Sequence, residues 1–280
     1  MKKNIDYVIL FFLSIIFIMI FKYSDAVKES ILSSLSLWAM SLIPSMLPIY
    51  IILDLLINYG LLDFFYRLFK NNAILLVFIS LISGTPTNVK YIKEFYEKSY
   101  ISKDTANFLL LFAYSPNPLF VLAFSPNVRI GILILIIIYL TNFFIFLLFK
   151  PQFALGKSIL PKRERLSFID CLSSSIASST NILILILGVV VVYGILNTLL
   201  GVLNLDSLLV CSILEITNGL VHIKDAGFPL FWLAFACLFG GLSIHTQIKS
   251  ILENTDLSYR YFLIGRLIAS IPLLLLALFY

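Results

Sequence analysis

Two apolar segments of this chain break at polar, turn-forming residues before they are long enough to cross a bilayer. The first begins at Ala73 and breaks at residues 83–88 (SGTPTN), and the second begins at Leu205 and breaks at residues 215–219 (EITNG). Backbone amides inside hydrocarbon need partners, so such breaks are tolerated only where protein or water surrounds them. Matching breaks in the two halves of a chain are typical of transporter binding sites. The sequence therefore predicts two re-entrant hairpins whose tips share one site.

The composition indicates an integral membrane protein. The chain has 280 residues, of which 60% are hydrophobic and 12% are charged, whereas soluble domains carry roughly 25% charged residues. At roughly 20 residues a span, this length is sufficient for about nine segments that cross or enter the membrane. We therefore expect an all-α, polytopic transmembrane protein in contact with the lipid bilayer.

The positive charges predict the orientation of the chain in the membrane. Lysines precede the first apolar run, and basic residues recur at alternate span ends, with the densest cluster in residues 150–166 and with Arg260 and Arg266 on the same side. Because cytoplasmic loops carry the excess of Lys and Arg, the N-terminus is predicted to face the cytoplasm. Residues 1–24 then form an uncleaved N-terminal transmembrane helix, with a cleaved signal peptide as the alternative.

The two halves repeat one order of elements: an amphipathic helix, a span, a re-entrant hairpin, a broken span and a closing span. The first repeat covers residues 25–149 and the second covers residues 167–280, with the basic cytoplasmic loop 150–166 between them. The two amphipathic pieces, residues 25–40 and 167–180, are expected at opposite faces of the membrane. This order predicts an inverted repeat, an arrangement that places a substrate site near the midplane of the bilayer.

The candidate substrate-binding residues lie in four interruptions of the apolar segments. They are Ser83, Gly84, Thr85, Thr87 and Asn88 in the first hairpin, Ser115 and Asn117 in YSPNP, Glu215, Thr217, Asn218 and Gly219 in the second hairpin, and Ser243, His245 and Gln247 in FGGLSIHTQIK. A helix that begins inside the membrane, as after Pro86, offers N–H groups and a positive dipole end to a carboxylate. The alternative is that the prolines of SGTPTN and YSPNP only kink helices for packing.

Two of the candidate residues, Glu215 and His245, are ionisable, and the sequence allows more than one role for each. Glu215 lies in a membrane segment, where an ionisable group is costly and points to function. It is predicted either to carry a coupling proton or Na⁺, or to be protonated and hydrogen-bonded so that it holds the hairpin tip closed. Histidine titrates near neutral pH, but a helix-packing role for His245 fits the sequence equally well.

Enzyme and nucleic-acid functions are not supported by any motif. The sequence contains no G-x-S-x-G, P-loop or H-E-x-x-H, and no paired-carboxylate cluster beside a histidine. Cys171, Cys211 and Cys237 lack C-x-x-C spacing and are expected to pack between helices. The basic residues are scattered at span ends and do not form a nucleic-acid surface. We therefore expect a protein that is not an enzyme and that has no cofactor or metal.

Several segments together resemble one family. SLIPSMLP (41–48), SGTPTNVKYIKEFYEK (83–98), YSPNPLFVLAF (114–124), LEITNGL (214–220), FGGLSIHTQIKSIL (239–252) and GRLIAS (265–270) resemble the YlbJ-type sporulation integral membrane proteins. That family is part of a wider group with nucleoside-recognition (Gate) domains, which is similar to concentrative nucleoside transporters. The resemblance implies a role in endospore formation, in the mother-cell-derived outer forespore membrane, where the family is associated with moving dipicolinic acid.

Three functional hypotheses follow from the residues and the resemblance. The first is a carrier for a small aromatic anion, most specifically dipicolinate, and the second is a transporter of nucleosides or bases. The third is a non-transporting membrane partner in spore assembly that acts through the basic loop 150–166. The sequence does not determine the coupling ion, the direction of transport or whether the chain forms a homo-oligomer.

Overall fold

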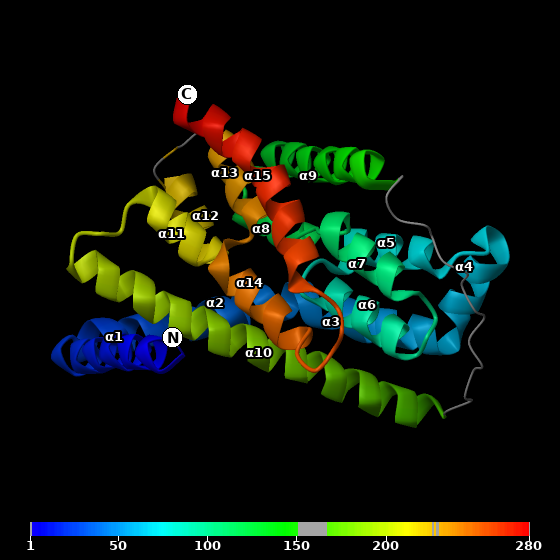
Figure 1. Ribbon diagram of the computed structural model, residues 1–280, viewed down its shortest axis with the longest axis horizontal. Coiled ribbons are helices and arrows are strands. Elements are labelled where there is room, and N and C mark those ends of the chain that lie inside the picture. Colours follow the sequence, from blue (N-terminus) through cyan, green and yellow to red (C-terminus); the bar gives the residue numbers. More distant parts are fainter. Residues whose placement is uncertain (1, 151–166, 226, 228–229, 280) are drawn as a thin grey trace.

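The computed structural model describes residues 2–150, 167–225, 227 and 230–279 (Figure 1). Every regular element in these residues is a helix. Six helical segments are long and apolar enough to cross a membrane: Ile5–Lys22, Ser24–Phe69, Val128–Phe149, Phe168–Val202, Leu230–Ile251 and Tyr259–Leu276. The predicted all-α, polytopic membrane fold is therefore confirmed. The basic loop 150–166 lies outside the described residues, except for Lys150.

The first half begins with two long helical segments. Helix α1 spans Lys2–Lys22, and its window Ile5–Lys22 has no buried residue. The next segment runs from Ser24 to Phe69 and comprises α2 (Ser24–Leu37), α3 (Ile43–Leu56) and α4 (Leu62–Phe69). A π-helical turn at Trp38–Leu42 joins α2 to α3, and a kink at Gly60, with φ 112°, lies between α3 and α4. The amphipathic piece 25–40 is thus joined to the span that follows it, while its place at a face of the membrane stays a prediction.

One small polar residue of this piece, Ser34, is buried against another helix, whereas Ser33 and Ser36 are exposed. Helix α10 spans Phe168–Val202 and packs along α2 and α3. A Cβ atom added at Gly194 of α10 would lie 2.8 Å from Ser34 Oγ of α2, so the two backbones approach closely, as small residues allow. Helix α10 also contains the second predicted amphipathic piece, 167–180. At 1.5 Å per residue its 35 residues extend for about 52 Å, well beyond the roughly 30 Å of hydrocarbon.

Each predicted break is a turn between two short helices. The first hairpin is α5 (Asn72–Ser83) and α6 (Thr87–Glu97), and the second is α11 (Leu208–Leu214) and α12 (Ile216–Asp225). The first broken span is α7 (Lys103–Phe112) and α8 (Pro118–Phe124), and the second is α13 (Leu230–Phe239) and α14 (Gly241–Ile251). The closing helices are α9 (Val128–Phe149) and α15 (Tyr259–Phe279). The order of elements is therefore the same in both halves, while their inverted orientation stays a prediction.

Local capping explains where several of these helices begin. The side chains of Asn71, Ser102, Asn117, Asn127 and Ser207 accept hydrogen bonds from the first backbone N–H groups of α5, α7, α8, α9 and α11. A side chain of this kind satisfies donors that have no partner within the helix. Short helices can therefore start at membrane depth without leaving all of their first amides unpaired.

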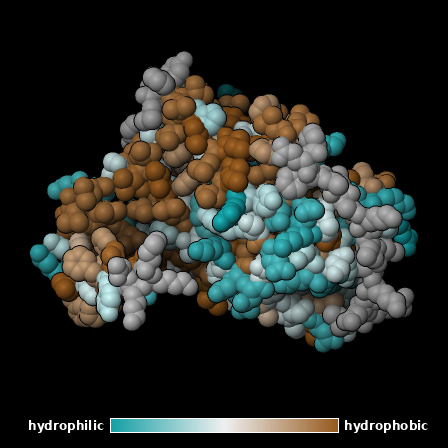
Figure 2. All heavy atoms as spheres, viewed as in Figure 1, coloured by the Kyte–Doolittle hydropathy of each residue, from teal (hydrophilic) through white to brown (hydrophobic). Residues whose placement is uncertain are grey.

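The halves meet along the first parts of the broken spans. Helix α15 packs against both α13 and α7, and α13 also packs against α9. Figure 2 shows apolar side chains over the region of α13 and α15, whereas hydrophilic side chains gather over α6. The described molecule thus combines a broad apolar surface, suited to lipid, with a polar patch over one arm of the first hairpin.

Candidate functional site

The tip of the first hairpin presses against the break of the first broken span. Gly84 has φ +73°, and a Cβ atom added there would collide with the backbone of Pro116 and Asn117. The Thr85 N–H donates to the carbonyl of Ser115 at 2.7 Å. The peptide bond between Thr85 and Pro86 is cis. Glycine is therefore required at this position for both its backbone conformation and its lack of a side chain.

Two asparagines satisfy the backbone groups that these breaks leave open. Asn117 Nδ2 donates to the carbonyl of Ser83 at 3.3 Å, and its Oδ1 accepts from the N–H of Leu119 at 2.9 Å. Asn88 Nδ2 donates to the carbonyl of Ala113 at 2.5 Å. The interrupted backbone is thus paired by protein, as burial in a membrane requires.

The tip of the second hairpin is organised by Glu215. This residue is 1% exposed and lies between α11 and α12. One carboxylate oxygen accepts from Thr217 Oγ1 at 3.0 Å, and the other accepts from the N–H of Asn218 at 2.8 Å. Glu215 therefore caps the N-terminus of α12 with its own side chain, which is the favoured end for a negative charge. Gly219 lies on the next turn and packs against the backbone of Ser212.

The second tip presses against the second break in the same way. Gly240 and Gly241 have φ values of +83° and +67°, and a Cβ atom added at Gly241 would lie 2.9 Å from the backbone nitrogen of Ile216. Within the described residues, no hydrogen bond joins the two tips directly. Each tip instead packs against the broken span of its own half, so the tips can be separated without breaking a direct bond between them.

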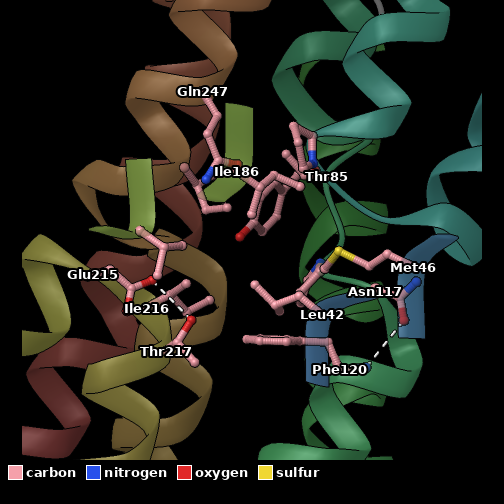
Figure 3. Close-up of a pocket in the computed structure, with 15 residues that line it drawn as sticks. Leu42, Met46, Thr85, Asn117, Phe120, Ile186, Glu215, Ile216, Thr217 and Gln247 are labelled. Atoms are coloured by element: carbon pink, nitrogen blue, oxygen red, sulfur yellow. Dashed lines mark hydrogen bonds between the residues drawn. The ribbon is translucent and has the colours of Figure 1, made fainter. Parts of the chain in front are cut away.

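A small cavity lies where the tips come together (Figure 3). Its volume is about 30 Å³, which is enough for one or two water molecules. The predicted site residues that line it are Thr85 and Asn117 from the first half and Glu215, Thr217 and Gln247 from the second. Apolar side chains from α3, α8 and α10 and from the π-helical turn, among them Met46, Phe120 and Ile186, complete the wall.

Some buried polar atoms at this site have no hydrogen-bond partner within the described residues. They are Thr85 Oγ1, Asn88 Oδ1 and Gln247 Oε1. Buried polar groups are nearly always hydrogen-bonded in native proteins, so such atoms call for an explanation. A bound polar solute or water between the tips would supply partners for Thr85 and Gln247, whereas Asn88 does not line the cavity.

The other predicted site residues lie beside the cavity or face elsewhere. Ser83, Thr87, Ser115 and Ser243 are buried in the hairpin tips and broken spans. His245 is held by Tyr259 Oη at 2.7 Å from Nδ1 and by the Phe239 carbonyl at 3.1 Å from Nε2, an arrangement that fits the packing role. Asn218 lines a separate polar cavity of about 230 Å³ with Asn197 and His222.

The side chain of Arg266 is buried in the bundle, whereas the distribution of basic residues predicts it on the cytoplasmic side. It was expected near the cytoplasm, but its side chain is 0% exposed in the middle of the bundle. The guanidinium donates to the carbonyl of Leu238 at 3.3 Å, to Asn142 Oδ1 at 3.3 Å and, at the limit of 3.5 Å, to the carbonyl of Leu111. Leu111 and Leu238 lie in the last turns of α7 and α13, where helix dipoles favour a cation.

The surroundings of Arg266 link it to the cavity. Its Cζ lies 4.0 Å from the ring centroid of Tyr114, and Tyr114 also lines the cavity between the tips. The Tyr114 hydroxyl donates to the Cys237 carbonyl at 2.8 Å, and Asn142 Nδ2 donates to the Tyr114 carbonyl. No acidic side chain of the described residues pairs with Arg266. Gly265, the residue before Arg266, packs so closely on Leu111 that no side chain would fit there.

A second charged cluster holds one arm of the first hairpin. Asp54 of α3 lies 3.3 Å from Lys90 Nζ and accepts from the Tyr91 hydroxyl at 2.5 Å. Lys90 also pairs with Glu94 at 3.6 Å. These groups do not line the cavity between the tips. Their contacts hold α6 against α3.

Comparison with known proteins supports the family resemblance. The chain is 24% identical to the sporulation integral membrane protein YlbJ of Bacillus subtilis (strain 168), over an alignment of 313 residues that covers 90% of this chain and 77% of that protein. No protein-family model matches the chain, and no solved structure matches it. The likeness to the YlbJ-type sporulation integral membrane proteins is thus confirmed, whereas a nucleoside-recognition (Gate) domain stays a prediction.

Proposed function

We propose that this sporulation-type integral membrane protein is a carrier, and not an enzyme, for a small aromatic anion, most specifically dipicolinate. We further propose that it acts in the outer forespore membrane with its N-terminus in the cytoplasm. The observation that carries the proposal is the cavity between the two hairpin tips, where buried side-chain oxygens of Thr85 and Gln247 have no hydrogen-bond partner among the described residues. Two tips from different halves that meet at one polar point are typical of carriers whose substrate lies at the midplane.

The electrostatics of the described site favour an anion. The N-terminus of α6 lies at the cavity, because Thr85 and Pro86 line it and the helix begins at Thr87. The equivalent end of α12 is already occupied by Glu215. At this end the N–H groups of Thr85 and Asn88 are already bonded to the carbonyls of Ser115 and Gly84, so the helix offers a carboxylate mainly its positive dipole end. The Arg266 cation lies behind Tyr114.

Glu215 suggests how transport would be coupled. A dicarboxylate and an ionised Glu215 in one low-dielectric cavity would repel each other. Uptake of a proton by Glu215 would remove this repulsion, so we propose that a proton accompanies the substrate. A Na⁺ ion beside Glu215 would have the same effect, and the two alternatives are separated by whether a pH gradient or a Na⁺ gradient drives uptake.

Binding requires the tips to separate. A pyridine dicarboxylate is larger than the cavity of about 30 Å³, so the described arrangement corresponds to closed tips. Each tip is bound to its own broken span and not to the other tip, as described above. We therefore propose that each tip moves together with the broken span of its own half.

The test is uptake of labelled dipicolinate by proteoliposomes that contain the purified full-length protein, with empty vesicles as the blank. We expect saturable uptake that falls at least tenfold, an order-of-magnitude loss, in Glu215→Gln, Asn88→Ala and Thr85→Val. Thr141→Val is the matched control for Thr85→Val, because Thr141 Oγ1 bonds only the Ile137 carbonyl of its own helix, at 2.7 Å. Uptake that is unaffected by all three tip variants would refute this site.

A transporter of nucleosides or bases is the second candidate. The side-chain amide of Gln247 lines the cavity, and its Oε1 has no hydrogen-bond partner among the described residues. An amide is suited to the hydrogen-bonding edge of a base. Uptake of labelled uridine in place of dipicolinate would support this candidate. If neither solute moves while the protein is folded and inserted, the third hypothesis, a non-transporting partner in spore assembly, becomes the conclusion.

A further inference from the structure

A groove on the surface of the bundle lies apart from the cavity between the hairpin tips. It is bounded by α5, α7 and α9 and has a volume of about 500 Å³. Phenylalanines of α7 and α9 form one wall, with the rings of Phe112 and Phe146 5.1 Å apart. The opposite wall carries Ile74 and Val77 of α5. Ile74 is 38% exposed and Phe143 is 57% exposed, so the groove is open to the surroundings of the helices.

The polar residues of this groove do not offer binding groups to a polar solute. Ser80 Oγ donates to the Leu76 carbonyl at 2.8 Å, and the Tyr139 hydroxyl donates to the Leu81 carbonyl at 3.1 Å. The Asn142 side chain is engaged on both sides, by the Tyr114 carbonyl and by Arg266. The groove therefore presents mainly hydrocarbon, which suits an acyl chain and not a sugar, a nucleotide or a dicarboxylate.

One end of the groove carries a cation. Lys150 follows the last residue of α9, is exposed, and lines the groove with its Nζ 5.5 Å from the ring centroid of Phe146. It forms no ion pair with any acidic residue among those that the structure describes. Its place at the end of a membrane-spanning helix puts it at the depth of lipid headgroups, where basic groups between helices bind anionic lipids.

We infer that the groove is a binding site for a phospholipid with an anionic headgroup, one acyl chain lying between α5, α7 and α9 and the headgroup at Lys150. The charge at one end and the apolar walls along the rest match the two parts of such a lipid. The acyl chain of the lipid would pack on Ala113 and Tyr114 at the end of α7. It would therefore support the helix end from which Tyr114 reaches the cavity between the tips. This inference does not depend on the proposed transport activity.

The test measures lipid retained by the full-length protein in native mass spectrometry. The protein in detergent is titrated with phosphatidylglycerol or with phosphatidylcholine of the same acyl chains. We expect phosphatidylglycerol to bind more tightly, and Lys150→Gln to weaken its binding about fivefold, as expected for one basic group near a lipid headgroup. Phosphatidylcholine binding should change by less than twofold, an expectation that follows from its lack of net charge. Lys22→Gln is the matched control, because Lys22 also ends an apolar helix and lies over an aromatic ring.

The apolar part of the site is tested separately by filling the groove. Val77→Trp should reduce the retention of both lipids, whereas Val192→Trp, at a 55% exposed position of α10, should not. Ile74→Trp tests the same space from the exposed mouth if Val77→Trp does not fold. Equal affinity for the two lipids would overturn the inference. So would Lys150→Gln behaving like Lys22→Gln, or tryptophan at both groove positions leaving lipid retention unchanged.

Discussion

Gly84→Ala is the sharpest test of how the first hairpin docks on its broken span. The Cβ atom of alanine would meet backbone atoms of Pro116 and Asn117, which cannot rotate away as a side chain could. The backbone of Gly84, at φ +73° and ψ 176°, also lies in a region that is essentially restricted to glycine. Alanine there carries strain of about 1 to 3 kcal/mol. The tip must therefore withdraw from the break.

The hydrogen bonds of the tip account for the rest of the expected loss in the free energy of unfolding. Withdrawal stretches the bond from Thr85 N–H to the Ser115 carbonyl and the bond from Asn117 Nδ2 to the Ser83 carbonyl. Each such bond contributes about 1 kcal/mol. Together with the backbone strain, the expected loss in the free energy of unfolding is about 4 kcal/mol. For a chain of this size that corresponds to a fall in Tm of about 10 °C.

The buried cysteines provide the assay. Cys171, Cys211 and Cys237 are free and between 1% and 3% exposed, so a thiol-reactive fluorescent dye reports unfolding of the protein in detergent as the temperature rises. The matched control is Gly188→Ala in α10, where an added Cβ has nothing within 4 Å and helix propensity predicts a gain of about 0.5 to 1 kcal/mol. If Gly84→Ala melts within a degree or two of Gly188→Ala, a margin well below the expected shift, the docking described here is wrong.

Three further predictions concern contacts that hold the bundle together. Arg266→Lys keeps the buried charge but cannot bridge both helix ends, so we expect a loss of about 2 to 4 kcal/mol in the free energy of unfolding, measured by the same dye; an unchanged melting curve would contradict the bridging role. Tyr91→Phe removes the bond to Asp54 and should cost about 1.5 to 3 kcal/mol; a double-mutant cycle with Asp54→Asn should show coupling, and simple additivity would argue against the contact. Lys93→Met removes the donor to the Ile251 carbonyl at 2.9 Å and should cost about 1 kcal/mol, with faster amide hydrogen exchange at the end of α14; unchanged exchange there would show that the contact does not stabilise that helix end.

Much of the local structure could be predicted because its causes are local. Apolar runs long enough to cross a membrane form helices, and the interruptions at residues 83–88 and at Gly240 form turns. A single proline does not have this effect, because Pro48 and Pro272 lie inside α3 and α15. Serine and asparagine caps mark several helix starts. The surroundings of the two amphipathic pieces could not be predicted, because a serine-rich helix face has the same sequence pattern whether it faces water or packs against another helix. In the tertiary structure Ser34 packs on Gly194 of α10, whereas Ser33 and Ser36 of the same helix are exposed.

The site was predictable in part for the same reason. Glu215 and the residues of the two tips could be singled out because a polar residue in an apolar run is visible in the sequence alone. What only the tertiary structure decided is which of these residues meet: Thr85, Glu215 and Gln247 line one cavity, while His245 holds helices together. Arg266 shows the limit most clearly. Besides the side chain of Asn142, its partners are the backbone carbonyls of Leu111 and Leu238. A carbonyl is present in every residue, so no side-chain pattern marks these two. Only the packing of α15 across two broken spans brings those two helix ends to one guanidinium.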